Sequence, residues 1–174
     1  MVQILWRLLL IILIAIAANI TEILVVFDAT TYNTTKYGEE WLEVIGGDLE
    51  KTIDDSKLST LEFALEVQPL IDDREKCEDF IRKKKKQMIE ASNSVCFNVY
   101  LATDGWYYIP DFEATDDYVI EKRSWYTGAL KMNGKPYVTD PYVHAMTGNI
   151  CFSVSVMLAD GKSIACMDYT LDSL

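Results

Sequence analysis

Residues 118–126 read Tyr-Val-Ile-Glu-Lys-Arg-Ser-Trp-Tyr, so one short segment holds an arginine, a tryptophan and two tyrosines. The guanidinium of Arg123 is a planar fork of N–H donors that matches a carboxylate. The rings of Trp125 and Tyr126 are flat apolar walls, each with one polar tip. This combination predicts a pocket for a small organic molecule that carries an anionic group. The alternative is an aromatic core cluster built around a structural arginine.

The segments around this stretch predict an antiparallel sheet. Asp104-Gly105 and Asp160-Gly161 are turn signals, and the runs on either side of them are rich in β-branched and aromatic residues. Residues 123–132 predict a short helix that ends at Asn133-Gly134. Five segments are predicted as strands: 95–101, 106–109, 135–139, 150–158 and 163–169. Residues 93–174 therefore predict a PAS-like module with a five-stranded antiparallel sheet.

Residues 28–92 are predicted to be helical. Apolar residues recur at steps of three to four over 28–70, where Gly46-Gly47 interrupts the pattern or marks a kink. A second helical pattern spans 58–70 and ends near Pro69, because proline cannot continue a helix. A third spans 74–91. The fold class is thus α+β, with long N-terminal helices followed by the sheet.

Residues 1–27 predict export. The run from Leu8 to Ala18 is unbroken apolar sequence, with Arg7 before it and Glu22 and Asp28 after it. This charge order favours an N-terminus inside and the remainder outside the cytoplasm. We expect an uncleaved transmembrane signal anchor. The alternatives are a signal peptide, for which Ala15-Ile16-Ala17 supplies a small-x-small cleavage pattern, and a buried core helix.

The charge balance excludes one class of partner. The chain of 174 residues has 16 Lys and Arg against 27 Asp and Glu, a formal net charge of −11. A nucleic-acid-binding domain would normally carry a basic face, so no nucleic-acid partner is expected. The one basic run, residues 82–86, is predicted to be the solvated face of a helix.

No catalytic, metal or cofactor motif is present in the sequence. It contains no G-x-S-x-G and no Walker-type glycine loop, and the single histidine, His144, is expected to be a surface or turn residue. We therefore expect no enzyme activity, no metal and no cofactor. The four cysteines lack C-x-x-C spacing and could be either disulfides or buried thiols: Cys77, Cys96, Cys151 and Cys166.

The sequence resembles the double Cache (dCache) family of extracytoplasmic sensor domains from bacterial and archaeal receptors. The resemblance covers roughly residues 20–174. It rests on residues 99–107, on Arg123-Ser-Trp125-Tyr126, on Thr139-Asp140-Pro141-Tyr142, on Ala159-Asp160-Gly161 and on Met167-Asp168-Tyr169. The family implies a sensor role in signal transduction, as in chemotaxis.

The resemblance implies a binding site for an amino acid or a related amine. The amino-acid-binding members carry a pattern that matches six residues of this chain: Tyr118, Arg123, Trp125, Tyr126, Tyr142 and Asp168. Arg123, Trp125 and Tyr126 would hold the ligand's carboxylate. Asp168, Tyr142 and Tyr118 would hold its ammonium.

Two alternatives and one further expectation concern these residues. Tyr137 is a rival for the position given to Tyr142. The ligand's side chain is expected to meet residues such as Tyr108 of the first hairpin, and the loop before Tyr118. Without a ligand, Arg123 and Asp168 would form an internal salt bridge, and the module would be an exported structural or protein-interaction domain.

The family also implies partners and a larger context. A membrane is expected through the N-terminal helix, and a homodimer through residues 20–55. Members carry a second, membrane-proximal module and a cytoplasmic output. The sequence ends at Leu174, after the distal module, which predicts a fragment or a short variant. The output, whether chemoreceptor, histidine kinase or cyclase, lies outside what these residues encode.

Overall fold

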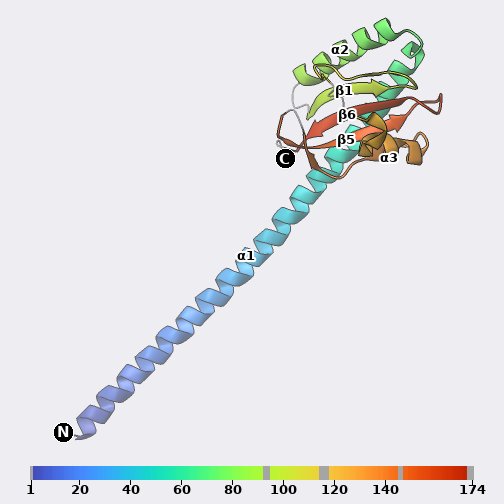
Figure 1. Cartoon of the computed structure of the whole chain (residues 1–174). Coiled ribbons are helices and arrows are strands. Elements are labelled where there is room, and N and C mark those ends of the chain that lie inside the picture. The colour runs from blue at the N-terminus through green and yellow to red at the C-terminus, as the bar shows by residue number, and fades with distance from the viewer. Residues whose placement is uncertain (1, 92–94, 114–117, 145–146, 172–174) are drawn as a thin grey trace. The chain divides into compact units, whose positions relative to one another are not determined.

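The computed structural model describes residues 2–91, 95–113, 118–144 and 147–171, with side chains from Asn19 onward. It divides into two compact units, Met1–Gly47 and Asp48–Leu174. The confirmed fold class is α+β, with a long N-terminal helix and an antiparallel sheet (Figure 1).

Helix α1 runs without a break from Val2 to Val67. Neither the predicted interruption at Gly46-Gly47 nor a separate helix from Leu58 is present. The helix ends where the sequence predicts, because Pro69 lies in the short 3-10 helix η1 (Gln68–Leu70) that follows it.

The first unit consists of the N-terminal part of α1. Its apolar side chains between Ile20 and Ile45 are exposed, including Trp41 at 67%. Among the residues with described side chains, none of the helices is both long enough and apolar enough to cross a membrane. Residues 1–18 of the expected anchor lie outside the described side chains, so the anchor over residues 1–27 stays a prediction.

Helix α2 (Arg74–Glu90) begins with a side-chain cap and carries the basic run. The Asp73 carboxylate accepts a hydrogen bond from the backbone N–H of Lys76, which satisfies one of the N–H groups at the helix start. Lys84 pairs with Glu66 at 2.5 Å and Lys85 with Asp111 at 2.9 Å. The basic run lies on a helix, as predicted, but it is not a uniformly solvated face, because the Lys84 and Lys85 side chains are only 16% and 15% exposed.

The sheet contains the five predicted strands and one more. Its order is β2-β1-β6-β5-β3, all pairs are antiparallel, and the extra strand β4 also pairs with β5. The strands are β1 (Cys96–Ala102), β2 (Tyr107–Tyr108), β3 (Tyr137–Val138), β4 (Tyr142–Val143), β5 (Ile150–Met157) and β6 (Ile164–Thr170).

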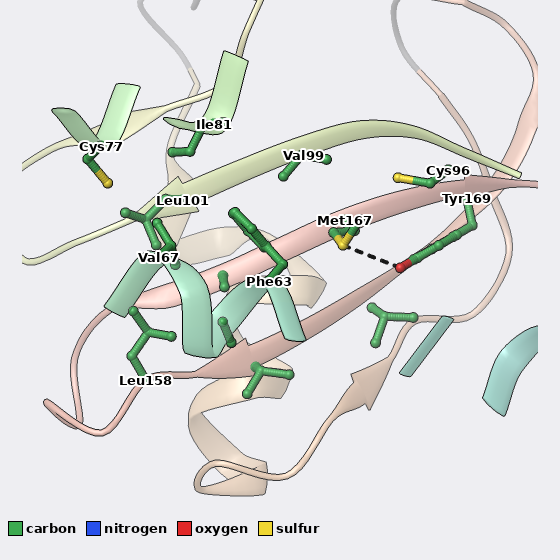
Figure 2. Packing of buried hydrophobic residues seen from close by; sticks show 14 of the residues in the cluster. Phe63, Val67, Cys77, Ile81, Cys96, Val99, Leu101, Leu158, Met167 and Tyr169 are labelled. Atoms are coloured by element: carbon green, nitrogen blue, oxygen red, sulfur yellow. Dashed lines mark hydrogen bonds between the residues drawn. The ribbon is translucent and has the colours of Figure 1, made fainter. Parts of the chain in front are cut away.

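One face of the sheet packs against α2 and the C-terminal part of α1 (Figure 2). Phe63 of α1 and Met167 of β6 are fully buried there, and Phe63 stacks on Phe80 of α2 with ring centroids 6.3 Å apart. The Tyr169 hydroxyl donates to the Ser56 carbonyl at 3.0 Å. These contacts fix the end of α1 on the central strand β6.

The other face packs against helix α3 (Ser124–Met132), which follows the 3-10 helix η2 (Ile120–Lys122) and contacts β5 and β6 (Figure 1). Asn133 and Gly134 end α3, with φ of 49° and 88°, as the Asn-Gly signal predicts. The Trp125 carbonyl accepts from Ser155 Oγ at 2.7 Å. This bond fixes the start of α3 over β5.

All four cysteines are buried thiols, which favours the small-apolar reading of these residues. Burial raises the pKa of Cys77 to about 11 and that of Cys96 to about 12. Neither thiol is set up to act as a nucleophile at neutral pH, because the thiolate is the reactive form.

Gly128→Ala is expected to destabilise the protein by about 1–3 kcal/mol, the usual cost of overpacking a filled core. A Cβ at Gly128 would lie 2.2 Å from the ring of Tyr137, so α3 and β3 would have to separate. Urea denaturation measures the change. Gly46→Ala is the matched control, because a Cβ there meets nothing within 4 Å. Equal stability of the two variants would contradict this packing.

Candidate functional site

Three neighbouring strands bring polar side chains together on the α3 face of the sheet. Asn98 of β1 and Ser153 of β5 are both the direct cross-strand partners of Asp168 on the central strand β6. Side chains alternate between the two faces of a strand, so these residues point away from the apolar core of α1 and α2. All three are at most 3% exposed.

Asp168 is a buried carboxylate held by hydroxyl groups. Its Oδ1 accepts from Ser153 Oγ at 2.7 Å, from the Tyr100 hydroxyl at 2.8 Å and from the Tyr142 hydroxyl at 3.3 Å. Its Oδ2 accepts from Asn98 Nδ2 at 3.3 Å. Burial raises the pKa of Asp168, and the hydrogen bonds from Ser153 and Tyr100 oppose that rise.

His144 borders the second oxygen of this carboxylate. Its Nε2 lies 3.9 Å from Asp168 Oδ2, and its side chain is only 11% exposed. The residue lies in a turn, as the expectation of a surface or turn residue allows, and its side chain faces the site. The ring packs edge-on against Phe97, and its Nδ1 accepts from the backbone N–H of Thr147 at 3.3 Å. Nδ1 therefore faces Thr147, and Nε2 faces the carboxylate.

Arg123 and Trp125 stand at the start of α3. The Arg123 guanidinium lies over the ring of Tyr118, 4.2 Å from its centroid, and forms no ion pair with any other described residue. Trp125 is buried and meets Tyr100 edge-on at 5.0 Å. Asp168 takes its hydrogen bonds from other groups, so the internal Arg123–Asp168 salt bridge is absent among the described contacts.

A cavity of about 640 Å³ lies between these groups. Its lining is formed by Asn98, Tyr100, Ile109, Phe112, Tyr118, Lys122, Arg123, Ser124, Trp125, Tyr142, His144 and Asp168. The structure thus brings together Tyr118, Arg123, Trp125, Tyr142 and Asp168 around one space. Tyr126 is not in the lining, and it contacts Trp125 with ring centroids 5.8 Å apart.

Two tyrosines considered from the sequence lie elsewhere. Tyr137, the rival of Tyr142, packs on Gly128 of α3. Tyr108 packs with the apolar core on the α1 and α2 side of the sheet, so the expectation that it meets a ligand is wrong. The next residue, Ile109, points to the cavity instead.

The polar side chains of Asn98 and Asp168 form the floor of the cavity, and an apolar wall faces them. It consists of Ile109, Phe112 and Tyr118, with the rings of Phe112 and Tyr118 centred 4.7 Å apart. Part of the loop before Tyr118, residues 114–117, lies outside the described residues. The described part of that loop supplies the wall through Phe112.

Four residues of the site escaped sequence reasoning: Asn98, Tyr100, Ser153 and His144. The sequence held part of the information that would identify two of them. Asn98 in β1 and Ser153 in β5 are polar residues within largely apolar strands. A buried polar residue in such a strand needs a partner. The cross-strand register that supplies this partner is not visible in the sequence.

This arrangement suits binding of a small zwitterion. It holds the cationic side chains of Lys122 and Arg123, one buried carboxylate and hydroxyl groups around a space large enough for a small organic molecule. Among the residues that the structure describes, no group of three His, Cys, Asp or Glu side chains could hold a metal ion.

Comparison with known proteins identifies sequence relatives among chemotaxis receptors. No family model matches the chain. The methyl-accepting chemotaxis protein McpB of Bacillus subtilis is 32% identical over 96 residues, which cover 54% of this chain and 14% of McpB. The methyl-accepting chemotaxis protein TlpA of the same organism is 29% identical over 134 residues, which cover 72% of this chain and 20% of TlpA. The chain thus matches a fifth or less of the length of these relatives.

Solved structures share the fold. The ligand-binding domain of the Pseudomonas fluorescens chemoreceptor CtaA, solved in complex with L-alanine, matches with a TM-score of 0.56 and 23% identity. The match covers 78% of this chain and 58% of that domain. The ligand-binding domain of the Pseudomonas aeruginosa amino-acid chemoreceptor PctC, in complex with GABA, matches with a TM-score of 0.53 and 24% identity over 71% of this chain and 59% of that domain. The chain therefore shares the fold of these domains, and the expected α+β fold is confirmed.

Asp168→Asn is expected to stabilise the ligand-free protein at neutral pH, by about 1 kcal/mol. The folded-state pKa of Asp168 is raised, so the folded state binds more protons than the unfolded state between the ordinary value of 3.8 and the raised value. The contribution of this group to stability therefore falls as pH rises through that window. An asparagine keeps the acceptor for the three hydroxyls and removes the buried charge.

Urea denaturation of both proteins at pH 7 and near pH 4 measures this effect. The control is Asp160→Asn, because hydrogen bonds from Ser163 outweigh burial there and lower the Asp160 pKa. The stability from Asp160 is present above 3.8 and is lost as pH falls further, so its asparagine variant should lose stability at pH 7. If Asp168→Asn also lowers the stability at pH 7, the ionised Asp168 carboxylate stabilises the fold and the prediction is wrong.

Proposed function

We propose that residues 93–174 form the ligand-binding module of a chemoreceptor-type signal-transduction protein and bind a small zwitterion, an amino acid or related amine. One observation carries this proposal. The cavity holds a guanidinium without an anionic partner and a buried carboxylate without a lysine or arginine partner among the described residues. A ligand with a carboxylate and an ammonium completes both.

The carboxylate end of the ligand binds at the start of α3. Arg123 donates charge-assisted hydrogen bonds to it, and the Trp125 indole N–H adds a donor. The stacking of Arg123 on Tyr118 supports this role, because it holds the guanidinium beside the cavity without neutralising it.

The ammonium end binds at the floor. Asp168 supplies the negative charge, and Tyr142 and Tyr118 add hydroxyl and ring contacts. The hydroxyls of Ser153 and Tyr100 oppose the rise in the Asp168 pKa and hold the carboxyl group in place before the ligand arrives, which lowers the cost of binding. The apolar wall, with Ile109 and Phe112, receives the ligand's side chain.

The relatives and neighbours support the same function. The sequence relatives are methyl-accepting chemotaxis proteins, and the two structural neighbours are chemoreceptor domains in complex with L-alanine and GABA. We infer that the site binds without chemical turnover. An exported structural module without a small ligand is the alternative, and it gives no role to the buried Asp168 carboxyl group at the cavity.

The larger context is proposed on the same basis. Residues 1–27 anchor the chain in the cell membrane, and the rest lies outside the cytoplasm. A homodimer forms through the N-terminal helix, which is supported by the exposed apolar side chains of residues 20–45. The ligand then signals by binding one of two conformations more tightly than the other.

Calorimetric titration of the full chain with the twenty L-amino acids and common amines tests the proposal. One ligand class should bind one-to-one, and its affinity should fall at least thirtyfold in Arg123→Ala and in Asp168→Ala, since each variant leaves a charged partner unpaired, at a cost of about 2 kcal/mol or more.

Arg82→Ala is the matched control, because Arg82 pairs with Asp79 on α2 and does not line the cavity. Its affinity should equal that of the wild type. Binding that survives in Arg123→Ala and in Asp168→Ala would place the ligand elsewhere, and a folded wild-type protein that binds none of these compounds would contradict the function.

A further inference from the structure

We propose that Asn98 is a specificity-determining residue that selects ligands with at least two N–H groups on their ammonium. The inference rests on the proposed function, because it concerns the same cavity. Asn98 lines this cavity from β1, is 3% exposed, and belongs to neither the sequence pattern nor the resemblance described above.

The hydrogen bonds of Asn98 are incomplete. Its Nδ2 donates to Asp168 Oδ2 at 3.3 Å, and its Oδ1 is the one buried side-chain polar atom without a partner among the described residues. Turning the amide over would not solve this, because Oδ1 would then face the Asp168 carboxylate as a second acceptor. An unpaired buried acceptor costs free energy, so a group that donates to it stabilises the site.

The two oxygens of Asp168 differ in how they are occupied. Oδ1 already accepts from the hydroxyls of Ser153 and Tyr100, which occupy its two lone pairs. The Tyr142 hydroxyl lies farther from Oδ1, at 3.3 Å, and 2.8 Å from Ser153 Oγ. Oδ2 has only Asn98 Nδ2, with His144 Nε2 at 3.9 Å. A ligand ammonium is therefore held by Oδ2, on the side of the carboxylate where the Asn98 amide lies.

This placement gives the ammonium two acceptors. One N–H group binds Asp168 Oδ2, and a second binds Asn98 Oδ1. The two acceptors are neighbours, because Nδ2 of the same Asn98 amide donates to Asp168 Oδ2. A primary or monomethyl ammonium can satisfy both acceptors. A dimethylammonium has one N–H and leaves one acceptor unpaired, and a trimethylammonium leaves both unpaired. The site thus separates amines by their number of N–H donors.

The test measures the affinity of the full chain for four amino acids of different side-chain class, each with its N,N-dimethyl form: L-alanine, L-leucine, L-glutamate and L-lysine. For those that bind, the dimethyl form should bind the wild type at least tenfold more weakly. In Asn98→Leu, which has nearly the same shape, the affinity for the primary amine should fall about tenfold and the ratio between the two forms should shrink to threefold or less.

Asn98→Asp provides the rescue variant. The two adjacent carboxyls would share one proton, so the new side chain donates to Asp168 Oδ2 and keeps a carbonyl acceptor in the place of Asn98 Oδ1. It should retain most of the wild-type discrimination. A structural role of Asn98 alone would not restore this ratio.

The outcomes separate the two claims. Binding by the wild type together with unchanged discrimination in a folded Asn98→Leu variant overturns the role of Asn98 and leaves the proposed function standing. If the wild type binds none of the eight compounds, the ligand found in the calorimetric titration and its N,N-dimethyl form replace them. A wild type that binds none of the twenty L-amino acids and common amines overturns the proposed function and this inference with it. Loss of the primary-amine preference in Asn98→Leu, with rescue in Asn98→Asp, supports both.

Discussion

The burial of one carboxylate on the central strand is the constraint on which the rest of the site depends. A charge can be buried only where hydrogen bonds replace the water it loses. Asp168 receives them from Ser153 and Asn98, its partners on the two adjacent strands, and from tyrosine hydroxyls. The antiparallel register of β1, β6 and β5 is therefore a requirement of the site as well as of the fold, since a shift by one residue would turn every one of these side chains to the opposite face.

The two faces of the sheet have different roles, one in stability and the other in the proposed binding. The face toward α1 and α2 is apolar and closely packed around Phe63 and Met167, and the face toward α3 carries the polar floor. A ligand in the cavity contacts β6 and the start of α3. The other face of β6 holds the end of α1 through Tyr169, whose hydroxyl donates to the Ser56 carbonyl. One strand thus connects the candidate site to the helix that leaves the module.

Local sequence patterns predicted the elements, but they could not predict how these elements meet. Alternation and turn residues placed the long strands and α3 within a few positions. The continuity of α1 was missed because two glycines in a helix cost only about 1 kcal/mol each. Strand β4 was missed because two residues show no period. Arg123, Trp125 and Asp168 were proposed from spacing and from the resemblance. Asn98 and Ser153 can be assigned to the site only from their strand pairing with Asp168, and His144 only from the position of its turn against that carboxyl group.

A crystal structure of the protein with a bound amino acid tests the central claim most directly. We expect the ligand in the cavity of about 640 Å³, with its carboxylate on the Arg123 guanidinium and its ammonium on Asp168 Oδ2. A ligand bound elsewhere, such as in the groove lined by Leu61, Leu65 and Met157, would contradict it. A ligand bound in the cavity with its ammonium toward Arg123 would also contradict it, because Arg123 is proposed to bind the carboxylate and Asp168 the ammonium.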